Sequence, residues 1–311
     1  RRHKLIIGQK VNPVNSREMA MNSGTLQLVD RSRLTSAFNT IFEYGLFSES
    51  TFRLSSRNYI RALTSVTSGD GDVPMQNDFG GLKYGFRIDY LPNGLFTRYG
   101  QFRQSDLVRE RIPKLVFGIR GSFNQGISSR RGRTQGDIVY LDKDFLPSLP
   151  NYWQMGADFL FKFQGLSVLG EFVSSDASVP ENIDYRVRND GSISSSFLID
   201  GNQNIESYVK NRMMIGNGYN LQAGYVLKNG ISLDLRYCYL QAPEYSFLNN
   251  PTFYSRPEAI SIGLSKYFSR WYGFKMQSSV TRFSVDGANS MNGEPLTKPE
   301  WLVQFITSVL I

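Results

Sequence analysis

A chain of 311 residues can hold one large β domain or two ordinary domains, so its length does not decide the architecture. Its net charge of +8 would suit nucleic acid, an anionic surface or small anions. The basic residues are spread along the chain without a nucleic-acid-binding motif, so no nucleic acid partner is expected. No apolar run approaches the roughly 18 residues of a spanning helix, which excludes a helical membrane protein but not a membrane β-barrel.

The chain has a single cysteine, Cys238, and a single histidine, His3. Cys238 therefore has no partner for an internal disulfide or a zinc site. A histidine-based catalytic triad would depend on His3, which has no motif around it. We expect no enzymatic activity, no metal site and no cofactor, and an outer-membrane hydrolase is the weakest of the alternatives.

Segments that alternate apolar and polar residues recur along the chain and predict about twelve β-strands. Residues 42–52 and 59–67 alternate least well. The chain begins at Arg1 without a basic and apolar leader, so a signal peptide is expected to lie outside this numbering. The predicted strands are 3–10, 42–52, 59–67, 82–91, 114–123, 157–163, 166–174, 219–227, 231–239, 260–265, 272–277 and 301–311.

The clearest hairpin joins residues 219–227 to 231–239 through an Asn229-Gly230 turn, the strongest short-range hairpin signal. One face of the pair is apolar and the other is mostly polar or small. We expect the apolar face to meet lipid or a neighbouring barrel and the polar face to line a lumen. Predicted to face outward are Phe159, Phe161, Phe163, Leu221, Tyr225, Leu233, Leu235 and Tyr237; predicted to face inward are Lys162, Gln222, Asp234 and Arg236.

The connections between strands alternate between short turns and long polar loops. Short turns are predicted at 91–95, 163–166, 228–230 and 268–271, and long loops at 11–40, 124–151, 176–217, 241–256 and 284–298. Short turns on one rim and long loops on the other are typical of an antiparallel transmembrane β-barrel of the bacterial outer membrane. A soluble β-sandwich would have to expose the charged face and bury the aromatic face of roughly twelve strands, which the long loops disfavour.

Several short motifs resemble the phosphate-selective porin O/P family. They are residues 5–10 with Pro13, residues 28–32 and 38–39, residues 91–94, 105–107 and 112–115, and residues 218–225 and 256–258. The resemblance covers nearly the whole chain. It implies a sixteen-stranded barrel, usually trimeric, in which a long loop, residues 11–40 here, folds into the lumen as a constriction.

Members of that family also have N-terminal strands that this numbering lacks. The resemblance therefore implies that residues 1–311 form a single domain comprising the C-terminal three quarters of a barrel. About four strands would be missing between residues 3–10 and 301–311. We expect a gap there, without a continuous hydrogen-bond ladder.

In a pore, the functional groups are lumen-facing charges at the narrowest point. The candidate constriction residues are Lys10, Arg17, Arg31 and Arg33; the candidate lumen-wall residues are Lys83, Arg87, Arg120, Lys162, Arg236 and Lys275. Acidic Asp89, Asp158, Glu171 and Asp234 interrupt the wall set, and each basic residue can instead form a structural salt bridge. A cluster at Arg130, Arg131 and Arg133 suits lipopolysaccharide contact or a vestibule charge.

These features predict an outer-membrane porin, a passive diffusion channel for small solutes with a preference for anions, phosphate among them. The expected partners are outer-membrane lipid and lipopolysaccharide, small anions, and either two further copies in a homotrimer or other envelope proteins. The alternative is a non-conducting barrel that serves as a structural subunit of an envelope complex. Conductance would separate the two.

Overall fold

The chain folds into one antiparallel sheet of twelve strands, each paired with its neighbours along the sheet in chain order. The computed structural model describes residues 2–40, 42–69, 79–129, 138–250, 256–269, 273–285, 289–290 and 292–309. The strands are β1 (Arg2–Val11), β2 (Phe42–Arg53), β3 (Tyr59–Thr67), β4 (Lys83–Leu91), β5 (Lys114–Asn124), β7 (Asn151–Phe163), β8 (Leu166–Ser178), β13 (Gly216–Val226), β14 (Ile231–Gln241), β15 (Glu258–Tyr267), β16 (Phe274–Phe283) and β17 (Glu300–Val309). Each overlaps a predicted strand, so the all-β fold with about twelve strands is confirmed.

The hairpin of β13 and β14 is built as predicted, with Tyr225 opposite Leu233 and Val226 opposite Ser232. Gly230 closes the turn at φ 85°, and a Cβ at this position would collide with the carbonyl oxygen of Tyr267 on β15. A glycine is needed here for both its left-handed backbone and its lack of a side chain.

The two faces of the sheet have opposite characters, and the exposed one is apolar. Leu221, Leu233 and Leu235 are 50%, 61% and 53% exposed, whereas Gln222 and Arg236, on the other face, are buried. The predicted orientation is confirmed. In the rest of the predicted set, Tyr225 is exposed, Phe159, Phe161, Phe163 and Tyr237 are half-buried, and Lys162 and Asp234 are buried. We call the exposed face the outer face and the other the inner face.

The connections separate onto two rims, with one exception that corrects the sequence prediction. Links 54–58, 164–165, 227–230 and 268–273 are short, and those at the opposite rim are long. The predicted short turn at 91–95 is wrong, because β4 ends at Leu91 and β5 begins only at Lys114. Gly94 does turn the chain, at φ 84°, but the next residues pack inward, with Phe96 only 4% exposed. The short-turn rim therefore has one long link, residues 92–113.

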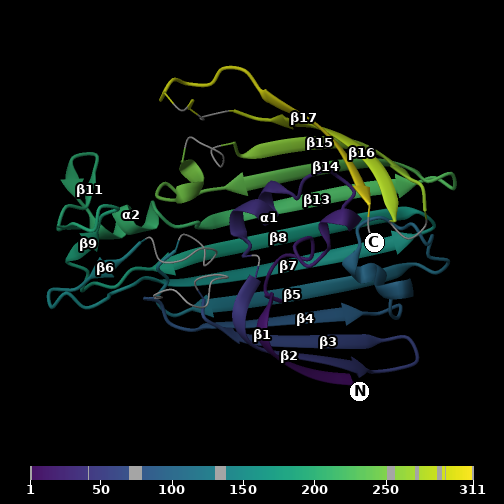
Figure 1. Cartoon of the computed structure of the whole chain (residues 1–311), viewed down its shortest axis with the longest axis horizontal. Helices are drawn as coiled ribbons and strands as arrows, with labels where there is room; N and C mark the ends of the chain where they lie inside the picture. Colours follow the sequence, from purple (N-terminus) through teal and green to yellow (C-terminus); the bar gives the residue numbers. More distant parts are fainter. Residues whose placement is uncertain are drawn as a thin grey trace.

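Residues 12–40 join β1 to β2 and cross the inner face of the sheet, in front of its central strands (Figure 1). The segment contains η1 (Ser23–Thr25) and α1 (Arg33–Phe38), whose N-cap Ser32 accepts a hydrogen bond from the Thr35 amide. Leu34 and Phe38 of α1 pack against Leu240 of β14 and its neighbours. We call residues 12–40 the inward segment.

The described parts of the long links, residues 125–129, 138–150 and 179–215, fold together beyond the ends of the strands (Figure 1). Their core includes Phe197 and Tyr208, whose rings meet edge to face at 5.3 Å. Strand alternation could not reveal this unit because its elements are so short. They are β6 (Tyr140–Leu141), β9 (Tyr185–Val187), β10 (Ile193–Ser194), β11 (Leu198–Ile199), β12 (Asn202–Gln203) and α2 (Ile205–Lys210).

Within the described residues, β1 pairs only with β2 and β17 pairs only with β16. The expected absence of a ladder between the two strands is therefore confirmed. The number of strands that would close the sheet stays a prediction. In the parts of the chain that the structure describes, no helix is long and apolar enough to cross a membrane.

Candidate functional site

Arg17 of the inward segment lies between two carboxylates of the sheet. Its Nη2 is 2.7 Å from Asp89 Oδ1 on β4, and its Nε is 2.6 Å from Asp158 Oδ1 on β7. Arg87 of β4 approaches the same carboxylates, at 2.9 Å from Asp89 Oδ1 and 2.5 Å from Asp158 Oδ2. Two guanidinium groups and two carboxylates thus form a closed ring, and Arg61 of β3 adds a third guanidinium, 3.5 Å from Asp89 Oδ2. Gly118 of β5 leaves room for the ring, because a Cβ there would lie 2.7 Å from Asp158 Oδ1.

All four charged side chains of this ring are buried, with at most 6% of any of the residues exposed. Removing charges from water costs several kcal/mol per ion, which close pairing and further hydrogen bonds must offset. Loss of one partner would leave a buried charge uncompensated. The ring therefore fixes the inward segment to β4 and β7.

Glu18, the next residue, makes a second attachment to the sheet. Its Oε1 accepts from Arg236 Nη2 of β14 at 2.7 Å, and its Oε2 accepts from the Ser32 and Thr35 hydroxyls at 2.8 and 2.7 Å. Burial opposes the ionised form, but the charge of Arg236 and the hydrogen bonds from Thr35 and Ser32 hold the pKa of the Glu18 carboxyl below its usual value. Glu18 therefore joins the start of α1 to the sheet as a carboxylate.

Gln104 connects the inward segment to residues 92–113, which enter from the other rim. Its Nε2 donates to Glu18 Oε1 at 2.9 Å, and its Oε1 accepts from the Gln27 amide at 2.7 Å. Gln222 of β13 donates to both Gln27 and Gln104, at 2.8 and 3.1 Å. The two links therefore meet above the centre of the inner face.

Lys162 of β7 holds residues 92–113 in place. Its ammonium donates to the carbonyl oxygens of Gly100, Arg103 and Ser105, at 2.9, 2.8 and 2.9 Å. An ammonium has three donors, so its hydrogen-bonding capacity is filled by this one chain segment.

Three other predicted wall residues also contact protein groups. Lys83 pairs with the buried Glu43 at 2.6 Å. Arg120 donates to the Val14 carbonyl and to Gln154, and Lys275 donates to the Leu26 carbonyl at 2.8 Å. The predicted wall residues thus all face inward, and most of them bind the two links that cover the inner face.

The remaining constriction candidates border cavities beside the inward segment. Lys10 pairs with Glu49 and lines a cavity of about 810 Å³ against β1–β3. Arg31 and Arg33 line a cavity of about 300 Å³ near β14–β17, together with Arg236. Arg31 donates to the Met21 carbonyl at 2.8 Å, and the Arg33 guanidinium lies 5.2 Å from the centre of the Phe283 ring. The four predicted constriction residues are thus not gathered at one point.

Sequence reasoning missed five basic residues of the larger cavity. Extending the alternation of β1 backward from Lys10 would have placed Lys4 and Arg2 on the same face. No comparable signal exists for Arg98, which lies in the link that was taken for a short turn. The missed residues are Arg2, Lys4, Arg53, Arg61 and Arg98.

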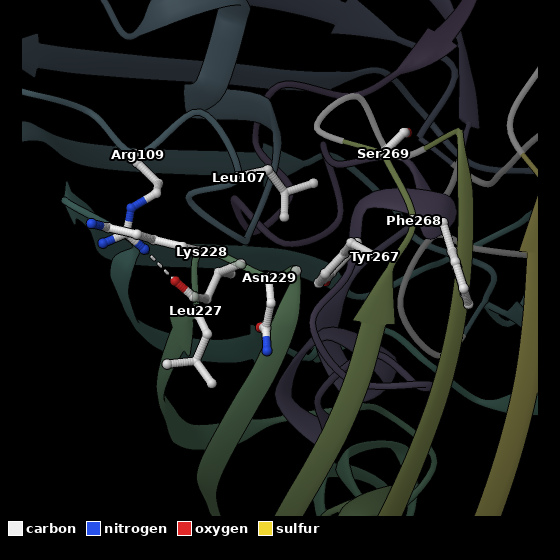
Figure 2. Close-up of a pocket in the computed structure, with 10 residues that line it drawn as sticks. Leu107, Arg109, Leu227, Lys228, Asn229, Tyr267, Phe268 and Ser269 are labelled. Atoms are coloured by element: carbon white, nitrogen blue, oxygen red, sulfur yellow. Dashed lines mark hydrogen bonds between the residues drawn. The ribbon is translucent and has the colours of Figure 1, made fainter.

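A separate cavity of about 400 Å³ lies at the short-turn rim (Figure 2). The turns 227–230 and 268–269 border it, and Leu107 and Tyr267 contribute apolar surface. Arg109, at the border of the cavity, donates to the Val226 carbonyl and also to the Tyr225 hydroxyl at 3.3 Å. The Arg109 side chain thus holds residues 92–113 against β13.

The described residues contain no group of three or more His, Cys, Asp or Glu side chains placed to hold a metal ion. The basic cluster expected at Arg130, Arg131 and Arg133 lies outside the described residues. Cys238 is buried on β14.

No family model matches the chain, and no curated protein matches it. The resemblance to the phosphate-selective porin O/P family therefore remains a prediction. Among solved structures, the chain is similar to OccK8 (OprE) of Pseudomonas aeruginosa, at 10% identity and a TM-score of 0.39. The match covers 91% of this chain and 61% of OccK8, so this chain spans less than two thirds of the length of OccK8.

Proposed function

We propose that the sheet forms most of the wall of a bacterial outer-membrane β-barrel, and that this barrel is a passive diffusion channel for small solutes with a preference for anions. The observation that carries the proposal is the reversal of the usual polarity. Apolar side chains cover the accessible face, while charged side chains lie on the covered face. Water would disfavour this arrangement, and a bilayer would favour it.

The strand dimensions support a membrane location. The twelve strands have 9 to 13 residues, and a tilted membrane-spanning strand needs about 9–11. Unpaired backbone groups at the edges of β1 and β17 would be costly in lipid. We therefore propose that further strands close the barrel between these edges. The resemblance to the phosphate-selective porin O/P family implies about four such strands.

Cations beside the inward segment support the preference for anions. One cavity lies against β1–β3 and the other against β14–β17, toward opposite edges of the sheet. Closure of the barrel would place both cavities in the same lumen. Each has more basic than acidic side chains in its lining. A positive lining in a low-dielectric wall concentrates anions and repels cations.

A non-conducting structural barrel is the second candidate, and the buried charge network favours it. Arg17, Arg87 and Arg236 are all paired with buried carboxylates, so none of them is presented to a passing ion. Two links from opposite rims also meet over the inner face. In this second case, the folded links at the long-loop rim would dock partner proteins.

Single-channel recording of the full-length protein in planar bilayers tests the proposal. A KCl gradient gives the conductance and, through the reversal potential, the ratio of chloride to potassium permeability. We expect stepwise conductance with chloride favoured. Addition of phosphate then tests the finer preference. Absence of conductance from correctly folded protein would support the structural barrel, and a potassium-selective pore would contradict the preference for anions.

A further inference from the structure

The cavity of about 810 Å³ lies between the inner face of β1–β3 and residues 95–102. Its lining has six basic side chains and a single acidic one: Arg2, Lys4, Lys10, Arg53, Arg61 and Arg98, with Glu49. Lys10 pairs with Glu49, so the charge of that carboxylate is already balanced. Arg61 also pairs with a carboxylate, Asp89 Oδ2 at 3.5 Å, which lies outside the lining. Basic side chains still outnumber acidic ones in the lining, which disfavours a cationic or neutral occupant relative to an anionic one.

The same cavity has an apolar wall, which a bare inorganic ion would not use. Its larger apolar lining residues include Tyr59, Leu63, Leu95, Phe96, Tyr99 and Phe102. Arg61 joins the two parts of the wall, because its guanidinium lies 5.0 Å from the centre of the Phe102 ring. The volume is within the range of about 300–1,000 Å³ that is common for small-molecule sites.

Gln101 adds an unsatisfied polar group to the lining. The residue is only 5% exposed, and its Oε1 has no hydrogen-bond partner. A buried carbonyl oxygen without a donor is costly, and an N–H or O–H group of a ligand would satisfy it. The residues that precede it, Arg98 and Tyr99, have φ of 50° and 59°, an uncommon conformation that tends to occur at ligand sites.

We infer that this cavity is a binding subsite for small organic anions that combine a carboxylate, an apolar body and an N–H or O–H donor. The carboxylate meets the basic side chains, the apolar body covers the aromatic and leucine wall, and the donor reaches Gln101 Oε1. The inference rests on the proposed channel function and adds the class of solute. Inorganic phosphate would satisfy the cations alone, so organic anions are selected over it.

Titration calorimetry of the detergent-solubilised full-length protein tests the chemistry with four probes. N-acetyl-leucine has all three groups, 4-methylpentanoate lacks the N–H donor, N-acetyl-leucinamide lacks the charge, and inorganic phosphate lacks the apolar body. We expect N-acetyl-leucine to bind at least about 10-fold more tightly than each of the others, since one lost interaction of this kind is worth about a factor of 10. Equal affinity for phosphate and N-acetyl-leucine would overturn the inference.

Variants locate the binding to this cavity. Lys4→Gln combined with Arg53→Gln should weaken N-acetyl-leucine binding about 10-fold. Arg57→Gln combined with Lys143→Gln removes the same charge from exposed positions that do not line the cavity, and should leave affinity unchanged. Gln101→Met should abolish the preference for N-acetyl-leucine over 4-methylpentanoate. If both charge pairs reduce affinity equally, the effect is one of net charge and the subsite is wrong.

Conductance separates this inference from the channel function on which it rests. A chloride-selective pore without N-acetyl-leucine binding would refute the subsite and leave the channel intact. Binding by a protein that does not conduct would refute the channel and leave the cavity as a ligand site of a closed barrel. For each variant, the far-ultraviolet dichroism spectrum and the shift of the unheated protein on gel electrophoresis verify folding.

Discussion

Arg17 and Asp158 lie 141 residues apart in the chain and 2.6 Å apart in space, both almost fully buried. This ion pair joins a connection between strands to the wall on which it rests. Because Arg87 and Asp89 complete the ring, the inward segment is held by charges that are stable only together. Its position on the inner face is therefore a property of the whole network.

We predict that Arg17→Met releases the inward segment. Loss of one partner of a buried ion pair costs about 3–5 kcal/mol, because the remaining charge is uncompensated. Limited proteolysis should show faster cleavage within residues 12–40, and the midpoint of thermal unfolding should fall. Arg57→Met, at an exposed turn, is the matched control and should change neither. A double-mutant cycle with Asp158→Asn should give less than additive losses; additive losses would show that the pair is not coupled.

Protonation of Glu18 at low pH should weaken the attachment of the inward segment to the sheet. Because its pKa in the folded protein is lowered, the carboxylate stabilises the fold fully above the ordinary pKa of about 4.3, and this stabilisation is lost as the pH falls through the lowered value. The protection factors of residues 18–36 against hydrogen exchange, taken relative to the intrinsic rate at each pH, should therefore fall below about pH 4. Glu18→Gln should have lower protection factors at neutral pH and lose less protection on acidification. An unchanged acid response in the variant would assign the effect to other carboxylates.

The strands could be predicted from sequence because apolar and polar side chains alternate along each strand. This alternation reveals the two different environments on the two faces of the strand. The links could not be predicted in this way. The Asn93-Gly94 signal is the same whether the next residues form a strand or, as here, fold inward to place Phe96 in the interior. Turn chemistry specifies a reversal of the chain and not its destination.

The inward orientation of the basic residues was predictable for the same reason, but their partners were not. The alternation placed Arg87 and Lys162 on the inner face. It contained no information that Asp158 would be shared by two arginines, or that three carbonyl groups of residues 100–105 would occupy the Lys162 ammonium. Such pairings depend on contacts between distant segments, and these form only in the assembled sheet.

A charged residue on the outer face should destabilise the protein if this face meets lipid. Leu235 is 53% exposed near the middle of β14, opposite Ala223 and Ile262. We predict that Leu235→Arg lowers the free energy of unfolding in lipid vesicles by about 2–4 kcal/mol, the cost of an arginine near the bilayer midplane. Ile193→Arg, at a 50% exposed position outside the twelve-stranded sheet, is the control and should change the free energy of unfolding by less than about 0.5 kcal/mol. Equal tolerance of both changes would indicate that the outer face meets water.

The turn between β13 and β14 lies close to the backbone of Tyr267 on β15. Gly230 and Gly191 have similar backbone conformations, at φ 85° and 80°, so alanine is strained at both positions. Only at Gly230 does an added Cβ meet another strand, because the Tyr267 carbonyl oxygen faces it, whereas nothing lies near Gly191. We therefore expect Gly191→Ala to cost about 1 kcal/mol and Gly230→Ala about 1–3 kcal/mol more, since the clash must displace the backbone of β15. Urea unfolding in lipid vesicles measures both. If the two substitutions cost the same, β15 moves aside freely at this rim, and the close approach of the turn to Tyr267 does not constrain the hairpin.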